Sequence, residues 1–514
     1  MRADLNALEQ SLRAGDIAPV RAALKSMLAR ELQRADLLRV ANLARRSGLI
    51  DFGLRLLNPI ILTDRPLLEE ATPEEKIEYA VLLAQAGAMT ESRQILRTID
   101  SQKYPEAILY TTFSLTPEWR YRETIPLLRK YLTTANNEYL KMVAEVNLIA
   151  ALIFTDAADE AEELLVRGLP FSAKKGYLRL HGNLFELAAQ RAILCHKYDQ
   201  ARNYLDRSLA IFKTISTPDS RYVEKWNAIL NVRQDPNRET LQKLKEVRQK
   251  AWTQGEWETA RDCDFHLAEN SAKGELISHL MFGTPYGEYR EKLHSKFSNY
   301  FQVPDFYVWH LGRSSIVQGY IESCNGKTGR NAQVFEVGQG THRLFQVLCR
   351  DFYRPQRIAD LNERLFPGEY FNPFSTPMRI QKACSRLRRA FTDHRIPIQV
   401  MIERNCVRLT SDQGFGVLRK WSEASSDPSR PPHIEELSYT FKSHRFTTKQ
   451  AAALWGCSVS TATRMLRQAI AARQCQVVGK GRSIGYVLVK PSHDQGRPCT
   501  DPSRNGVSDV RGTK

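Results

Sequence analysis

A short stretch of the chain, MRIQKACSRLRRAF at 378–391, carries five basic residues and no acidic one. Its apolar residues Ile380, Cys384, Leu387 and Phe391 recur at helical spacing, so about 100° per residue gathers them on one stripe of a helix. The opposite face carries Arg379, Lys382, Ser385, Arg386 and Arg389. Because cations on the outer face of a packed helix can neutralise phosphates, we predict a contact with nucleic acid here.

A second stretch near the C-terminus has the same character. Residues 441–490 contain nine Lys and Arg and no Asp or Glu. The pattern predicts a helix at about 449–455, a turn at Gly456, a cap at Ser458 and a second helix. The predicted buried side of this second helix is Val459, Ala462, Leu466 and Ile470, and its outward side is Ser460, Thr461, Arg464, Arg467 and Gln468. A glycine-flanked hairpin tip follows with Lys480 and Arg482, so we predict contacts with base edges and phosphates.

The distribution of charge along the chain agrees with these two stretches. The formal net charge is +17 over 514 residues. Residues 1–270 hold 38 Lys and Arg against 37 Asp and Glu, whereas residues 271–514 hold 36 against 20. This asymmetry favours a polyanion as the partner of the C-terminal half. A basic surface that only aids solubility is the alternative, and charge alone does not exclude it.

The elements around the first basic stretch follow a recognisable order. The segments THRLFQVL and RLFPGEYFNP predict two helices, SRLRRAF lies on the third, and 396–410 predicts a hairpin that ends in VRL. This order resembles the winged-helix output domain of the OmpR and PhoB group of bacterial response regulators. The resemblance implies that the third helix enters the major groove with the five polar and basic residues of 378–391, and that Arg404 lies on the wing. The wing departs from the family because Arg404, Asn405 and Cys406 replace its usual glycine-bearing turn and tyrosine. The second stretch resembles the helix-turn-helix of many bacterial repressors.

The N-terminal half contains a loose repeat. Six turn-prone or aromatic residues are each followed five positions later by a small residue. The pairs are Gly48/Gly53, Gly87/Ser92, Trp119/Thr124, Asp156/Ala161, His196/Ala201 and Gly255/Ala260. A small residue allows two helices to approach closely, so the pattern predicts stacked helical hairpins, and the 59-residue final interval leaves room for an unrecognised copy. The pattern resembles tetratricopeptide-like repeats, which implies binding of a protein partner, signal sensing or self-association. A spacer without a ligand is the alternative.

These patterns together predict a mainly α protein, with an N-terminal α-α helical-repeat solenoid followed by two small α+β winged-helix domains. The expected boundaries are 1–270 for the repeats, 271–331 for a connector with short strands, 332–410 for the first winged helix, 411–434 for a flexible linker, 435–490 for the second winged helix and 491–514 for a disordered tail.

Several other classes of function find no support in the sequence. No apolar run is long enough for a signal peptide or a membrane span, so we expect a cytoplasmic protein without a membrane partner. Nine cysteines form no CxxC pair and are expected to be free thiols. CNGKTGR lacks the first glycine of a phosphate-binding loop, and the histidines have no partner at ligand spacing. We therefore expect no catalytic residues, no metal and no cofactor, and hence no enzyme.

The sequence thus favours a bacterial transcription regulator that binds double-stranded DNA through both winged helices. The alternative is a scaffold of the PCI type, in which helical repeats end in a winged helix that packs against protein and binds no DNA. Binding of single-stranded RNA would require exposed aromatic residues on a sheet, and the sequence shows no such ladder.

Overall fold

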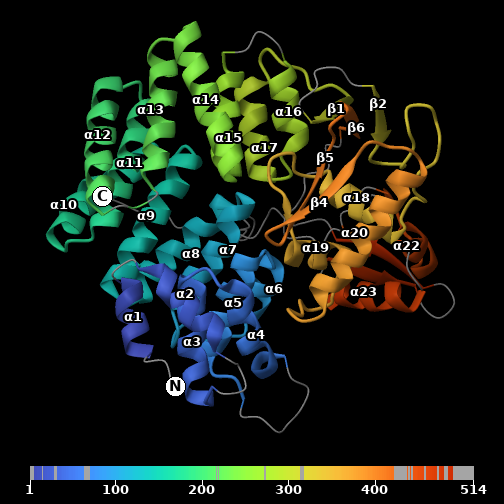
Figure 1. Cartoon of the computed structure of the whole chain (residues 1–514), viewed down its shortest axis with the longest axis horizontal. Coiled ribbons are helices and arrows are strands. Elements are labelled where there is room, and N and C mark those ends of the chain that lie inside the picture. The colour runs from blue at the N-terminus through green and yellow to red at the C-terminus, as the bar shows by residue number, and fades with distance from the viewer. Residues whose placement is uncertain are drawn as a thin grey trace, which may run out of the picture. The chain divides into compact units, whose positions relative to one another are not determined.

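A computed structural model of the chain describes residues 5–13, 16–27, 32–62, 70–215, 217, 219–270, 274–312, 318–421, 434, 437, 440–441, 444–455, 459–471, 474–479 and 484–489. The chain divides into two compact units, residues 1–435 and residues 436–514. The fold is mainly helical, with helical repeats in the N-terminal part and small sheets toward the C-terminus, which confirms the predicted fold class (Figure 1). The predicted tail, 491–514, lies outside the described residues.

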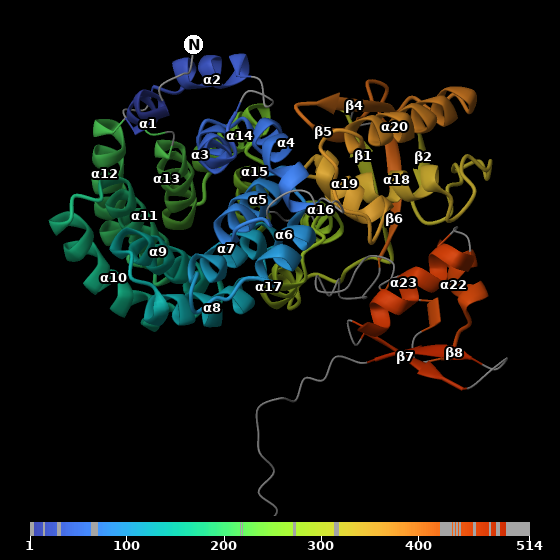
Figure 2. The same cartoon turned by 90° about the horizontal axis from the view of Figure 1, so that it is seen from below.

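The first unit begins with a long array of helices, in which consecutive helices pack side by side (Figure 2). They are α1 Leu5–Arg13, α2 Ile17–Ser26, α3 Arg34–Arg46, α4 Ile50–Ile61, α5 Pro73–Ala86, α6 Met89–Leu96, α7 Glu106–Leu115, α8 Tyr121–Thr134, α9 Glu138–Phe154, α10 Ala158–Lys174, α11 Leu178–Leu194, α12 Tyr198–Thr214, α13 Ser220–Gln234, α14 Arg238–Gln254, α15 Trp257–Ala268, α16 Glu275–Gly283 and α17 Gly287–Phe297. A short 3-10 helix, Thr116–Glu118, precedes α8. None of the described helices is long and apolar enough to cross a membrane.

The six turn residues of the predicted repeat share one backbone conformation. Gly48, Gly87, Trp119, Asp156, His196 and Gly255 all have positive φ, between 58° and 107°. A left-handed residue ends one helix and reverses the chain into the next, which explains why glycine recurs at these positions. The small residues that follow are all buried, from Gly53 on α4 to Ala260 on α15. The helical repeats predicted from this spacing are therefore confirmed.

The long final interval of the repeat contains a further hairpin, α13–α14. Its loop, 235–237, has an extended Asp235, and Asn237 caps α14 by accepting hydrogen bonds from the amides of Glu239 and Thr240. This capped loop contains no left-handed residue, in contrast to the six turns of the predicted repeat. The last turn residue of the predicted repeat, Gly255, lies between α14 and α15. It therefore follows the second helix of the α13–α14 hairpin.

The remainder of the first unit combines short strands with three helices. These elements are β1 Phe306–Leu311, β2 Gly319–Glu322, α18 Gly340–Leu348, β3 Gln356–Arg357, α19 Ile358–Leu365, α20 Thr376–Asp393, β4 Gln399–Glu403, β5 Cys406–Thr410 and β6 Phe415–Lys420. One sheet has the order β3-β5-β4, with both neighbouring pairs antiparallel. The other has the order β1-β6-β2, in which β6 runs antiparallel to β1 and parallel to β2.

Two predicted connecting segments are more ordered than expected. The segment 271–331, predicted as a connector with short strands, also contains the helices α16 and α17, which bury Phe282, Tyr289 and Phe297. The predicted linker 411–434 contains β6, the central strand of a sheet. The apolar residues of α16 recur at helical spacing, at Leu276, Ile277, Leu280 and Met281, so the sequence does carry a signal for this helix. The positions 422–433 lie outside the described residues.

The first predicted winged-helix segment, 332–410, shares its core with the repeat array. Leu344, Leu361 and Leu387 of α18, α19 and α20 belong to one buried cluster with Leu54 of α4 and Leu82 of α5. The helices α19 and α5 are in direct contact. The expected separate domain 332–410 is therefore part of the first compact unit, because the array supplies one wall of its core.

The second unit contains α22 Thr448–Trp455, α23 Val459–Ala471 and a hairpin of β7 Cys475–Val478 and β8 Gly485–Leu488. Phe446 forms an antiparallel bridge to Tyr486, and their rings are stacked with centroids 5.9 Å apart. Trp455, Leu466 and Phe446 are fully buried. The bridge residue Phe446, the two helices and the hairpin therefore enclose one small core.

Candidate nucleic-acid interface

Helix α20 carries the basic stretch on the face that the sequence predicts. Ile380, Cys384, Leu387 and Phe391 are at most 1% exposed and lie in the core shared with the array. Lys382, Ser385, Arg386 and Arg389 are exposed on the other side. Packing against α18 and α19 holds the apolar stripe in place. The outer face is thus a rigid row of cations about two turns long.

The basic residues of α20 differ in their partners. Arg379 forms an ion pair with Glu369, at 2.6 Å, and its guanidinium lies 3.9 Å from the centroid of the Phe366 ring. In the part of the chain that the structure describes, Lys382, Arg386 and Arg389 have no carboxylate within ion-pairing distance. An anion that approached α20 would therefore meet three uncompensated cations, whereas Arg379 would first have to leave Glu369.

The turn between β4 and β5 is the segment in which the sequence predicts a wing. Arg404 and Asn405 both have positive φ, 49° and 61°, as a two-residue hairpin turn of type I′ requires. The Arg404 side chain is exposed, but the side-chain amide of Asn405 donates a hydrogen bond to the Asp51 carboxylate of α4. The Asn405 carbonyl also accepts from the amide of Ile358, at 3.0 Å. The tip of this hairpin is therefore bonded to the array. The predicted contact between Arg404 and DNA requires the DNA to approach the hairpin beside α4.

The second helix of the second unit, α23, also buries one side. Ala462, Met465, Leu466 and Ala469 are at most 2% exposed, whereas Ser460, Arg464 and Arg467 are exposed. Val459, which the sequence places in the core, is 49% exposed because it begins the helix at the edge of the module. The side chains of Thr461 and Gln468 lie outside the described residues, as do Lys480 and Arg482 of the predicted hairpin tip and the predicted turn and cap, Gly456 and Ser458.

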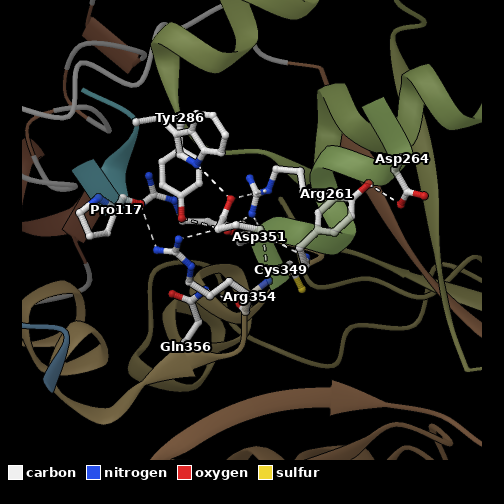
Figure 3. Close-up of polar contacts among 12 residues, drawn as sticks. Pro117, Arg261, Asp264, Tyr286, Cys349, Asp351, Arg354 and Gln356 are labelled. Carbon is white, nitrogen blue, oxygen red and sulfur yellow. Dashed lines mark hydrogen bonds and ion pairs between the residues drawn. The ribbon is translucent and has the colours of Figure 1, made fainter. Parts of the chain in front are cut away.

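A buried cluster of charges joins the end of the array to the segment before β3 (Figure 3). Arg261 on α15 is fully buried and donates to both oxygens of Asp351, at 2.8 Å each. Arg354 donates to Glu258 on α15 and to the carbonyl of Pro117, at 3.0 Å for the latter. Burial opposes ionisation of Asp351, but Arg261 and Arg354 outweigh it and hold the pKa of this carboxyl below its usual range. The cluster thus consists of mutually compensating charges.

Tyrosine side chains complete this cluster. Tyr353 donates its hydroxyl to Asp264, at 2.9 Å, and Tyr286 donates to Asp351, at 3.1 Å. The guanidinium of Arg261 lies about equally close to the Tyr286 and Tyr353 rings, with centroids 5.0 and 4.9 Å away. Because the partners are some ninety residues apart in the chain, no local spacing in the sequence revealed them. The cluster fixes the start of β3 and α19 relative to α15.

Two carboxyl groups form a second joint, between α6 and α19. Glu363 of α19 accepts hydrogen bonds from the amides of Glu91 and Thr90, at 2.8 and 3.3 Å, at the N-terminus of α6. Glu91, only 4% exposed, accepts in turn from the amide of Phe371, at 2.8 Å. Burial raises the pKa of Glu91 to about 8, with the nearby Glu363 adding to the effect and the Phe371 amide opposing it. The segment 332–410 thus supplies the Glu363 carboxyl, which the array binds. The array in turn supplies the Glu91 carboxyl, which the segment 332–410 binds.

This joint predicts a dependence of stability on pH. The pKa of Glu91 is higher in the folded chain than its ordinary value of 4.5, so the folded state binds a proton more tightly. The stabilisation is complete below about pH 4.5 and is lost as the pH rises toward 8. The free energy of unfolding should therefore fall between pH 6 and pH 9, and Glu91→Gln should flatten this fall. Urea denaturation at both pH values measures it, with exposed Glu74→Gln as the control. An equally steep fall in Glu91→Gln would contradict the assignment.

No protein-family model matches the sequence, and no curated protein matches it. Among the solved structures that are similar is that of a Rap protein complexed with competence and sporulation factor, with 10% identity, coverage of 58% of this chain and 92% of that chain, and a TM-score of 0.38. Another is the apo form of RapI, with 12% identity, coverage of 57% and 85%, and a TM-score of 0.34. Values this low assign no function to the chain.

Proposed function

We propose that the chain is a cytoplasmic regulator that acts by binding and not by catalysis. Its helical array binds a protein partner or a second copy of the chain, and its two C-terminal modules are winged helices that bind double-stranded DNA. In this proposal α20 of the first module and α23 of the second lie in the major groove.

The outer face of α20 carries this proposal. A helix that packs its whole apolar stripe and leaves Lys382, Arg386 and Arg389 in solvent, with no described acidic partner, suits a phosphate backbone. Ser385, among them, is short enough to approach a base edge, although its hydroxyl also donates to the Gln381 carbonyl. The order of elements from α18 to β5, with β3 paired to β5, supports the winged-helix assignment.

The array supports the partner-binding half of the proposal. Stacked helical hairpins form extended surfaces on which successive helices present side chains at regular intervals. Several large apolar side chains of the array are exposed, namely Tyr139, Val166, Phe171, Leu178 and Leu194. They lie on α9, α10 and α11, which pack against one another. Helices of a spacer without a partner have less reason to keep such residues in solvent.

A scaffold that does not bind DNA is the second candidate, and two observations favour it. The first module shares its core with α4 and α5, and its hairpin tip is bonded to Asp51. In a scaffold of the PCI type, the winged helix packs against protein and does not bind DNA. The two candidates nevertheless differ at α20, because a scaffold has no use for an outward row of unpaired cations unless an acidic protein covers it.

Binding of the full chain to a pool of random duplexes at 50 and 200 mM salt tests the proposal. If about eight phosphates are contacted, the logarithm of the association constant should fall with the logarithm of salt at a slope of about −7. Absence of binding at 50 mM salt would reject the DNA-binding proposal and leave the scaffold.

A further inference from the structure

The two C-terminal modules share one plan, although they lie in different compact units. In the first, β3 precedes α19 and α20 and pairs with β5, the second strand of the hairpin. In the second, Phe446 precedes α22 and α23 and pairs with Tyr486 on β8, again the second strand of the hairpin. Each module therefore presents its second helix in the same way, with the apolar side against the first helix.

The outward residues of the two presented helices are different. Along α20 the exposed side chains are a cation, a hydroxyl group and two further cations, in the order Lys382, Ser385, Arg386 and Arg389. On α23 the order is Ser460, Arg464 and Arg467, with the hydroxyl at the N-terminal end and the cations behind it. Since base pairs are distinguished by the donors and acceptors that meet them in the major groove, two unlike rows of side chains select unlike sequences.

We propose that one copy of the chain binds a composite site on a single duplex, made of two unlike half-sites, one read by α20 and the other by α23. This inference rests on the proposed DNA binding and adds the architecture of the target. A regulator with one reading module achieves a long site as a symmetric dimer on an inverted repeat, whereas this chain carries two different modules and needs no symmetry.

The length of the chain between the modules limits the spacing of the half-sites. Fifteen residues separate Trp421, next to β6, from Leu437, which is helical and fully buried in the second unit. Fully extended, these fifteen residues span at most about 55 Å, or roughly one and a half turns of DNA. When one module is bound, this tether keeps the other near the duplex at an effective concentration of about a millimolar, so the pair binds about 10²-fold more tightly than either module alone.

Selection from a pool of long random duplexes, carried out with the full chain, tests the composite site. The wild-type chain should enrich two unlike motifs on the same duplex, with centres within about one and a half turns. A variant with Arg386→Ala and Arg389→Ala should retain only one motif, and a variant with Arg464→Ala and Arg467→Ala should retain only the other. Insertion of 40 base pairs between the two motifs exceeds the tether and should weaken wild-type binding by about 10²-fold.

The possible outcomes separate this inference from the function on which it rests. Enrichment of a single motif, or of an inverted repeat, would overturn the composite site while leaving DNA binding intact. Loss of the same motif in both variants would overturn it as well. No enrichment with the wild-type chain would instead reject DNA binding itself.

Discussion

Replacement of Asp351 by alanine is expected to lower the free energy of unfolding of the first unit by about 3–5 kcal/mol. Asp351 is the acceptor for both Arg261 bonds, and the Arg261 side chain has no exposed surface. Without the carboxylate, a buried guanidinium loses its main counter-charge and cannot reach water. The cost is therefore that of an uncompensated buried charge, which is much larger than the net contribution of the intact pair.

Urea denaturation followed by tryptophan fluorescence measures this effect, and Asp305→Ala, at an exposed position, is the matched control. The double variant Arg261→Met with Asp351→Asn should cost clearly less than the sum of the two single changes, because it removes the charge together with its partner. Additive costs would show that the two side chains do not act as a pair. A loss below about 1 kcal/mol for Asp351→Ala would show that the site is hydrated.

The same cluster shows which parts of the structure the sequence could predict. The turns at Gly48 and Gly87 and the apolar stripe of α20 depend on residues a few positions apart, so periodicity and residue type predict them. The loop before α14 was not predicted. Its turn is stabilised by the Asn237 cap, whereas the predicted turns have a left-handed residue. Pairs such as Arg261 with Asp351 depend on how distant helices meet, and nothing local marks them. The joining of the first module to the array was unpredictable for this reason.

In the candidate interface, too, the sequence predicted what depends on local spacing and not what depends on contacts between distant segments. The outward position of Arg386 and Arg464 follows from helical spacing alone, and the structure agrees. The engagement of Arg379 with Glu369 was not expected, because the acid precedes the helix in a loop whose path the sequence does not define. The hydrogen bond between Asn405 and Asp51 is likewise a contact between distant segments. Composition therefore predicts the charge of the surface, whereas its partners follow only from the tertiary structure.

The combined change of Lys382, Arg386 and Arg389 to alanine should weaken binding to duplex DNA by about 10²-fold to 10³-fold at 0.1 M salt. Each cation that contacts a phosphate releases about 0.9 of a counterion, so the slope of log K against log salt should become less steep by about three. The three side chains are exposed and pair with no described acid, so the melting temperature should remain unchanged. Leu387→Ala, on the buried side of the same helix, should instead cost about 2–5 kcal/mol of stability.

The matched control for this variant removes the same charge from the array, by changing the exposed Lys103, Lys130 and Lys245 to alanine. Fluorescence anisotropy with a labelled duplex at several salt concentrations measures both variants. If the control weakens binding as much as the α20 variant, then net charge and not the face of α20 governs the affinity. If the α20 variant melts at the temperature of Leu387→Ala, then the basic face is buried in solution and the scaffold explains this helix better, since only a covering protein surface would make these cations contribute to stability.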